Sequence, residues 1–218
     1  IKATRNAHIR DGAAMAEFLC WLKSEINEPG SRITEISLAD HLERCRRAQG
    51  AYDLSFDTIA GYEAHGAVIH YSATPESDVE LKAEGLVLID SGGQYDDGTT
   101  DITRTVALGP VSENRRRNYT AVLKSHIALA TAVFGPETTG YDLDVIARKP
   151  LKDLGLDFRH GTGHGVGHML SVHEGPNTIT PGPSGKRCHI VPGMITSDEP
   201  GLYIEGQYGI RIENEILC

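Results

Sequence analysis

Apolar residues recur at helical spacing in two segments near the start of the chain. Residues 13–22 form a mostly apolar stretch that a helix would bury on one side. A second helix is expected after Thr34, a residue type that caps helix N-termini, because Leu38, Leu42 and Cys45 then fall on one face. The pattern predicts a pair of helices at the N-terminal end.

A second pair of helices is expected further along the chain. One helix is predicted over residues 113–133. A shorter helix begins near Tyr141 and is ended or kinked at Pro150, because proline lacks the amide hydrogen that a helix interior uses.

Between the two helix pairs, an apolar run leads into a carboxylate and a tight turn. Leu86–Ile89 has the composition of a buried strand, and Asp90 is followed by Ser91-Gly92-Gly93. Asp101 then opens a β-branched, alternating segment, residues 102–106, which predicts a returning strand. The two carboxylates can therefore converge across a hairpin.

The C-terminal part of the chain repeats this arrangement with glutamates. Residues 192–196 run into Glu199, and residues 209–213 return to end at Glu213. The two-residue period of a strand places Arg211 on the same face as Glu213, opposite the isoleucines of the same segment. A charged face opposite an apolar one suits a metal-binding cleft.

The order helix, helix, hairpin with two carboxylates thus occurs twice, which predicts an α+β fold with internal pseudo-twofold symmetry. Each half would give one hairpin to a shared curved antiparallel sheet, with the helices on its convex face and the concave face open. Residues 1–218 are expected to form a single catalytic domain. The chain begins within an apparent helix and ends on a strand, so it reads as part of a longer protein.

Composition excludes several classes of partner and site. The 218 residues include 30 acidic and 21 basic side chains, for a formal charge of −9, which disfavours nucleic acid and anionic membranes as partners. The four cysteines form no CxxC motif. The longest apolar stretch, residues 127–134, is too short to cross a bilayer, and no secretory segment is recognised. A cytoplasmic protein with reduced cysteines is the default expectation.

The two carboxylate pairs flank a segment, His160–Pro176, that is dense in glycine and histidine. An isolated Asp in a turn or Glu on a strand is usually structural, but four converging carboxylates would repel one another without cations. Oxygen ligands with one imidazole suit divalent manganese, cobalt or zinc, and carboxylates can bridge two ions. The candidate ligands of this dinuclear site are Asp90, Asp101, His164, Glu199 and Glu213.

Four segments resemble the metallopeptidases of pita-bread (creatinase/aminopeptidase) fold, and among them aminopeptidase P, the X-Pro aminopeptidase, of the larger multidomain kind. The segments are Asp90–Thr105, which reads DSGGQYDDGTTDITRT, His160–Pro176, Asp198–Tyr203, which reads DEPGLY, and Gly209–Asn214, which reads GIRIEN. The resemblance covers nearly the whole chain. It implies that the five candidate ligands hold two metal ions, which Asp101 and Glu213 bridge.

The resemblance also implies roles for residues around the ions. His70, His160 and His173 would contact the substrate or steady the tetrahedral intermediate. Taken alone, His70 in the apolar run Val68–Tyr71, interpreted as a strand, would more often be a core residue. Glu199 would move a proton from the attacking water to the leaving nitrogen, and Arg211 would orient a ligand carboxylate or form a purely structural ion pair.

The implied reaction is hydrolysis of the bond between an N-terminal residue and a following proline, by a water or hydroxide that bridges two divalent ions, Mn²⁺ first and Zn²⁺ or Co²⁺ as alternatives. Peptides with proline at the second position would be the substrates, and the full-length protein could form a homodimer. Three other interpretations of the function stay open at this point. They are a prolidase that cleaves X-Pro dipeptides, a catalytically inactive pita-bread binding module, and a creatinase-like hydrolase without metal.

Overall fold

The computed structural model describes every residue from Ile1 to Cys218. Its helices are α1 (Lys2–Glu25), α2 (Glu35–Ala48), α3 (Glu113–Ala130) and α4 (Gly140–Lys152), with short 3₁₀ helices η1 (Glu63–Ala67) and η2 (Pro183–Lys186). The strands of the first half are β1 (Asp53–Leu54), β2 (Ile59–Tyr62), β3 (Leu86–Ser91), β4 (Gly93–Tyr95), β5 (Gly98–Thr99) and β6 (Ile102–Ala107). Those of the second half are β7 (Gly163–His164), β8 (Thr178–Ile179), β9 (Ile195–Asp198), β10 (Gly201–Ile204), β11 (Tyr208–Arg211) and β12 (Asn214–Leu217).

The first helix pair packs as the apolar pattern predicts. Thr34 caps α2: its hydroxyl accepts a hydrogen bond from the Ser37 amide, and the Ser37 hydroxyl accepts one from the Thr34 amide. Leu38 and Leu42 are fully buried in a core that α1 and α2 form with strands β2, β3 and β6. The burial of these side chains fixes the helices against the sheet.

The first hairpin is built around a strand with no exposed residue. Strand β3 pairs antiparallel with β2 on one side and with β6 on the other, and all six of its residues are buried. In the β3–β6 register Asp90 lies opposite Thr103, so Asp101 comes just before the paired region. A small β4–β5 hairpin fills the connection between β3 and β6.

The second hairpin consists of two ladders separated by an irregular step. Strand β9 pairs with β12 up to Asp198 opposite Asn214, and β10 pairs with β11 from Gly201 opposite Arg211. Glu199 and Glu213 both lie in the step between the ladders. Their amides donate instead to neighbouring segments, from Glu199 to the Thr162 carbonyl at 2.8 Å and from Glu213 to the Thr103 carbonyl at 3.2 Å. The step thereby joins the hairpin to the segments that carry His164 and Asp101.

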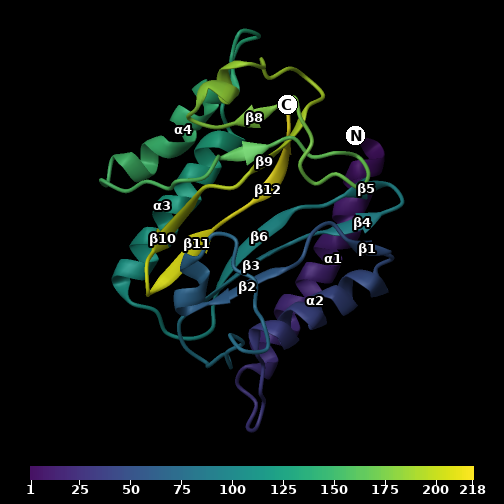
Figure 1. The fold of residues 1–218 in the computed structure, drawn as a ribbon, viewed down its shortest axis with the longest axis vertical. Coiled ribbons are helices and arrows are strands. Elements are labelled where there is room, and N and C mark those ends of the chain that lie inside the picture. Colours follow the sequence, from purple (N-terminus) through teal and green to yellow (C-terminus); the bar gives the residue numbers. More distant parts are fainter.

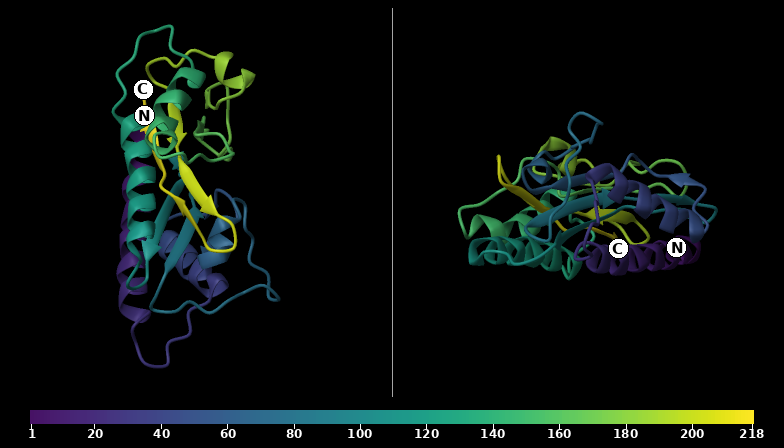
Figure 2. Two further views of the ribbon diagram at one scale, coloured as in Figure 1. Left: turned by 90° about the vertical axis from the view of Figure 1, so that its left-hand side faces the viewer. Right: turned by 90° about the horizontal axis from the view of Figure 1, so that it is seen from below.

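The helices and the histidine-rich segment lie on opposite faces of the strands. Figure 1 shows the two hairpins crossing the middle of the molecule, and the side view in Figure 2 places α1 and α3 along one face. Residues 160–176 run over the other face. The second core forms where α3 and Leu151 of α4 pack against β10 and β11.

Helices α4 and α1 form where the sequence predicted them, but their ends differ from the prediction. Helix α4 continues through Pro150 and ends at Lys152, so the proline occupies its last turn. Helix α1 extends beyond the predicted 13–22 in both directions. None of the helices is long and apolar enough to cross a membrane, and all four cysteines are free.

Candidate metal centre

A cavity of about 530 Å³ opens between the two hairpins and the histidine-rich segment. All five candidate ligands line it, together with the other sequence-predicted site residues His70, His160, His173 and Arg211. The structure therefore brings these residues, scattered from position 70 to position 213, to one cavity.

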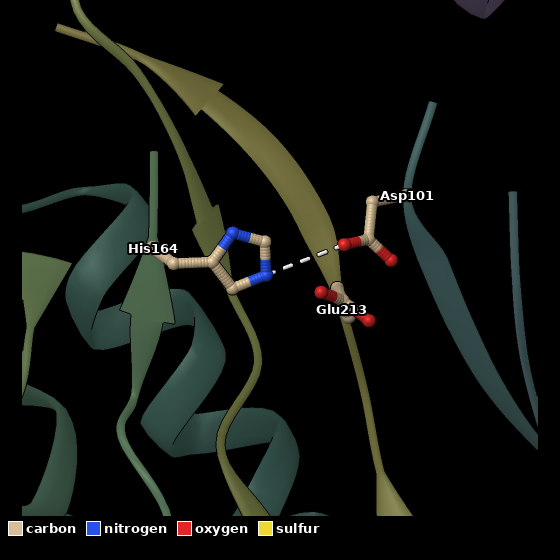
Figure 3. A group of neighbouring side chains, drawn as sticks. All are labelled: Asp101, His164 and Glu213. Carbon is tan, nitrogen blue, oxygen red and sulfur yellow. Dashed lines mark ion pairs between the residues drawn. The ribbon is translucent and has the colours of Figure 1, made fainter. Parts of the chain in front are cut away.

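The centre of the cavity is a cluster of three potential ligand atoms. One atom each from Asp101, His164 and Glu213 lie within 4.8 Å of one another, as Figure 3 shows. Glu199 joins them, because Nε2 of His164 lies 3.3 Å from its Oε1 and 3.4 Å from Oδ2 of Asp101. Three carboxylates, those of Asp101, Glu199 and Glu213, thus gather around the imidazole of His164.

The imidazole of His164 is held in the orientation that a metal ligand needs. Its Nδ1 donates a hydrogen bond to the Gly165 carbonyl at 3.0 Å, which leaves Nε2 facing the carboxylates. Histidine ligands usually fix their tautomer by this kind of backbone bond. Gly163, on the strand beside it, packs against the Ser197 carbonyl so closely that any side chain there would clash.

Asp90, the fifth candidate ligand, is engaged by Arg211 at the side of the cavity. Oδ2 of Asp90 accepts a 2.7 Å bond from Arg211, whereas its buried Oδ1 has no hydrogen-bond partner. Arg211 also donates to the Tyr203 hydroxyl at 2.7 Å, and that hydroxyl donates to Nε2 of His160 at 2.8 Å. The expected carboxylate-orienting contact of Arg211 is therefore present in the geometry.

Burial and mutual repulsion disfavour the charged form of the cavity carboxylates when no counter-charge is present. Burial raises the pKa of Asp101 to about 6 and that of Glu199 to about 8. Burial, followed by the charges of Asp101 and Glu199, raises the pKa of Glu213 well above its ordinary value. Burial alone would lower the pKa of His164, but the hydrogen bond with Asp101 and the charge of Glu199 raise it to about 9. Without a cation the cavity therefore favours protonated carboxyl groups, whereas a bound divalent cation would favour their charged form.

The residues present fit a pair of divalent ions on three independent grounds. The donor set is rich in carboxylate oxygen with one imidazole nitrogen. Oδ1 of Asp90 is buried and unpartnered, which is costly unless a cation or water meets it. The pKa values of Asp101, Glu199 and Glu213 are raised, which indicates that too little positive charge lies nearby to stabilise all three as carboxylates.

Two of the three predicted histidines face the cavity from exposed segments. The ring of His173 lies edge-on to that of His164, with centroids 4.4 Å apart. His70 also lines the cavity but does not lie on a strand as its apolar neighbours indicated; the chain forms a turn there after η1. The strand interpretation was wrong because Val68 is half exposed, so this run packs against no partner strand.

The imidazole of His160 is neutral at neutral pH. Burial and the nearby charge of Arg211 lower the pKa of His160 to about 4. Its Nδ1 donates to the Gly161 carbonyl and its Nε2 accepts from Tyr203, which is the pattern of a neutral imidazole. His160 is therefore an acceptor for Tyr203 rather than a cation at neutral pH.

Several residues that hold the ligands in place were not singled out from the sequence. The hydroxyl of Thr103 lies 2.5 Å from Oε2 of Glu213, and the Ser197 hydroxyl donates to Oε1 of Glu199 at 3.0 Å. The Ser197 hydroxyl also accepts from the His164 amide at 2.9 Å. Strand periodicity could have found both, since each lies two residues from a candidate ligand. Tyr203 carried no such signal.

The family model for metallopeptidase family M24 matches residues 2–218. The chain belongs to metallopeptidase family M24. Its fold is accordingly the pita-bread fold that the resemblance implied, and the α+β class with helices on the convex face of a curved sheet agrees with the prediction from the repeated hairpins. The family assignment agrees with the resemblance that the four sequence segments carry.

Aminopeptidase P is prominent among the relatives of this M24 chain. Aminopeptidase P1 of Arabidopsis thaliana is 43% identical over 100% of the chain and 37% of its own length. The X-prolyl aminopeptidase of Caenorhabditis elegans, described as a cytosolic enzyme with a di-nuclear active site, superimposes with a TM-score of 0.92 at 45% identity, over 98% of this chain and 35% of that one. Prolidase from Pyrococcus furiosus gives a TM-score of 0.78 at 31% identity, over 96% of this chain and 60% of that one. The chain spans about a third of the length of the curated relatives it matches.

Proposed function

We propose that this M24 domain is the catalytic part of a metal-dependent X-Pro aminopeptidase, which hydrolyses the bond between an N-terminal residue and a following proline. The observation that carries the proposal is that four carboxylates and the imidazole of His164 line one cavity, with three of the carboxylates gathered around that imidazole. The likeness to aminopeptidase P, at 43–49% identity for relatives from plants and fungi, supports the choice of substrate.

The five candidate ligands would hold two divalent ions, and we propose Mn²⁺, with Zn²⁺ and Co²⁺ as alternatives. Bound there, the ions would supply an acidified water and polarise the scissile carbonyl. Asp101 and Glu213 would bridge the two ions, as the family resemblance implies, and one potential ligand atom from each lies within 4.8 Å of the other and of His164. Arg211 would keep the carboxylate of Asp90 turned toward the cavity through its 2.7 Å bond.

The side chains around the cavity would handle the proton and the oxyanion. The proline nitrogen must receive a proton to leave, and Glu199, whose ordinary acidity is weakened by burial, is the proposed carrier. His173 and His70 line the same cavity and would donate hydrogen bonds to the developing oxyanion or to the substrate carbonyl. His160, fixed as a neutral ring by Tyr203, would contribute to substrate contacts without adding charge.

Prolidase is the second candidate because the prolidase of Pyrococcus furiosus shares this architecture. Its lower identity, 31% against 45% for the X-prolyl aminopeptidase of Caenorhabditis elegans, favours the aminopeptidase. An inactive binding module or a metal-free creatinase-like hydrolase is disfavoured, since all five candidate ligands are present.

The proposal is tested by assaying Ala-Pro and Ala-Pro-Ala with the manganese-loaded protein, before and after chelation and metal add-back. An X-Pro aminopeptidase releases alanine from the tripeptide, and the rate falls with chelation and returns with metal. Cleavage confined to the dipeptide would favour prolidase, and full activity after chelation would end the metallopeptidase proposal. The Glu199→Gln variant, which keeps the size of the side chain but removes the proposed proton carrier, is expected to lose turnover.

We further propose that residues 1–218 form one catalytic domain and that the protein is cytosolic, as the Caenorhabditis elegans enzyme is described to be. A homodimer of the full-length protein also stays a prediction. Sedimentation of the full-length protein tests the dimer, and fractionation of its cells tests the location.

A further inference from the structure

A histidine of helix α3 lies behind the cavity, outside the set that faces the substrate. His126 is 7% exposed and is enclosed between α3 and the β9–β12 ladder. Its two ring nitrogens contact the residues Asp198 and Asn214, which lie opposite each other in that ladder. Asp198 directly precedes Glu199, and Asn214 directly follows Glu213.

We propose that His126 is a positioning residue that ties together the two strands presenting Glu199 and Glu213, and so sets the spacing of these two metal ligands. The inference rests on the proposed metal centre. His126 itself touches no candidate ligand side chain, so its effect would act through Asp198 and Asn214.

The first contact ties His126 to the strand that leads into Glu199. Nδ1 of His126 lies 3.1 Å from the carbonyl oxygen of Asp198 and 3.1 Å from its Oδ2. The hydrogen bond goes to the carbonyl, and neither carboxylate oxygen of Asp198 has a hydrogen-bond partner. Because Asp198 is fully buried, the imidazole is the polar group that its carboxylate meets.

The second contact fixes which nitrogen of His126 carries the proton. Arg104 has only donors, and it donates to Oδ1 of Asn214 at 2.9 Å and to the Glu213 carbonyl at 2.7 Å. The amide group of Asn214 therefore turns its NH₂ toward His126, whose Nε2 accepts at 3.0 Å. Nδ1 must then carry the hydrogen that points at Asp198.

The result is one directed chain of hydrogen bonds, from Arg104 through Asn214 and His126 to Asp198. Neither the amide nor the imidazole can turn over without losing two bonds. The chain spans the step in the hairpin where Glu199 and Glu213 leave the regular ladders, which is where the backbone lacks its own pairing. Such contacts behind ligands typically change metal affinity by about 10–100-fold when removed.

The alternative is that His126 only fills space between α3 and the sheet, and metal binding separates the two cases. His126→Phe keeps the ring but removes both hydrogen bonds, whereas His126→Asn keeps a donor for Asp198. Chelator competition is expected to show Mn²⁺ affinity about 10–100-fold weaker in the Phe variant and intermediate in the Asn variant. The visible spectrum of the Co²⁺-loaded Phe variant should change, and kcat should fall more than KM rises.

His189→Phe, at an exposed histidine whose Nδ1 bonds the Glu137 carbonyl and no residue of the ladder, is the control and should leave metal affinity unchanged. Wild-type affinity and an unaltered Co²⁺ spectrum in both His126 variants would overturn the proposal. If the Phe variant does not fold, wild-type affinity in the Asn variant overturns it and weakened affinity supports it.

A nitrogen NMR measurement on the metal-free protein keeps this inference separate from the proposed function. It should find His126 protonated at Nδ1 and unprotonated at Nε2; the reverse tautomer would overturn the inference. If this tautomer is found in a protein that binds no divalent metal, the proposed metal centre is refuted. The hydrogen bonds by which His126 joins the two strands are then still supported.

Discussion

The guanidinium of Arg211 and the carboxylate of Asp90 form a 2.7 Å ion pair beside the metal cavity, and both groups are largely buried. The pair joins β11 of the second hairpin to β3 of the first. Arg211 thus links the two halves of the pseudo-twofold fold at the point where their carboxylates meet.

Replacing Arg211 by methionine is expected to lower both metal affinity and stability. The change leaves Asp90 buried without its cation, which typically costs about 3–5 kcal/mol in the free energy of unfolding. Metal affinity should fall by about 10–100-fold, since the ligand carboxylate loses its orientation. Urea unfolding of the metal-free protein and chelator competition measure the two effects.

Arg46→Met is the matched control for this prediction. Arg46 is fully buried and bonds the buried carboxylate of Asp11 at 2.8 Å, in a pair that lies outside the metal cavity. Its loss should destabilise the protein by a similar amount without changing metal affinity. An Arg211→Met variant that binds Mn²⁺ as tightly as the wild type would show that the ion pair is structural only.

Thr103→Val is expected to weaken metal binding through Glu213. It should also cost about 1–3 kcal/mol in the free energy of unfolding, because the buried Thr103 hydroxyl accepts a 3.3 Å bond from Nε of Arg211. The substitution conserves shape but removes the hydroxyl that bonds Oε2 of Glu213. Affinity for Mn²⁺ should fall about 10-fold or more. Thr120→Val, at an exposed threonine of α3 whose hydroxyl bonds only the Arg116 carbonyl, is the control. Equal affinities in the two variants would contradict the role given to Thr103.

The metal-free protein is expected to lose stability as pH rises from about 4 to about 9. Asp101, Glu199, Glu213 and His164 all have raised pKa values in the folded state. The folded protein therefore binds more protons than the unfolded chain in this range, and its free energy of unfolding falls with rising pH. With saturating metal the trend should be shallower or reversed, because metal ligands bind deprotonated.

Unfolding free energies at about pH 5 and about pH 8, with chelator and with Mn²⁺, measure this difference. A metal-free protein that is more stable at the higher pH would mean that the cavity carboxylates are not held close together. A parallel pH trend with and without Mn²⁺ would mean that these groups are not the ligands.

Gly209→Ala should destabilise the fold by about 1–3 kcal/mol or more, as overpacking does. A Cβ atom at position 209 would strike the backbone of Gly66, which β11 approaches closely beside η1. Gly135→Ala meets nothing nearby and should change stability by less than about 0.5 kcal/mol. Thermal unfolding compares the two, and a tolerated alanine at position 209 would contradict this close approach.

The two hairpins could be predicted because their signals are local. A buried strand that ends at a carboxylate, followed by glycines, specified Asp90, and strand alternation placed Arg211 beside Glu213. The prediction that these residues converge followed from the internal repeat and from the resemblance to M24 peptidases.

The contacts that hold the ligands were harder to predict because they join distant segments. The pairing of Arg211 with Asp90 spans 121 positions, and that of His126 with Asn214 spans 88. His70 was placed on a strand because its three apolar or aromatic neighbours, Val68, Ile69 and Tyr71, have the same pattern in a buried strand and in a half-exposed turn. His126 lies in a mostly apolar helical stretch, where a histidine carries no signal of its partners.

The central claim is that five side chains from both hairpins and the histidine-rich segment hold two metal ions. Anomalous X-ray diffraction from manganese-loaded crystals tests it most directly. We predict two anomalous peaks in the cavity, within bonding distance of Asp90, Asp101, His164, Glu199 and Glu213, with Asp101 and Glu213 between them. Peaks at other sites, or a cavity without manganese at saturating concentration, would contradict the account.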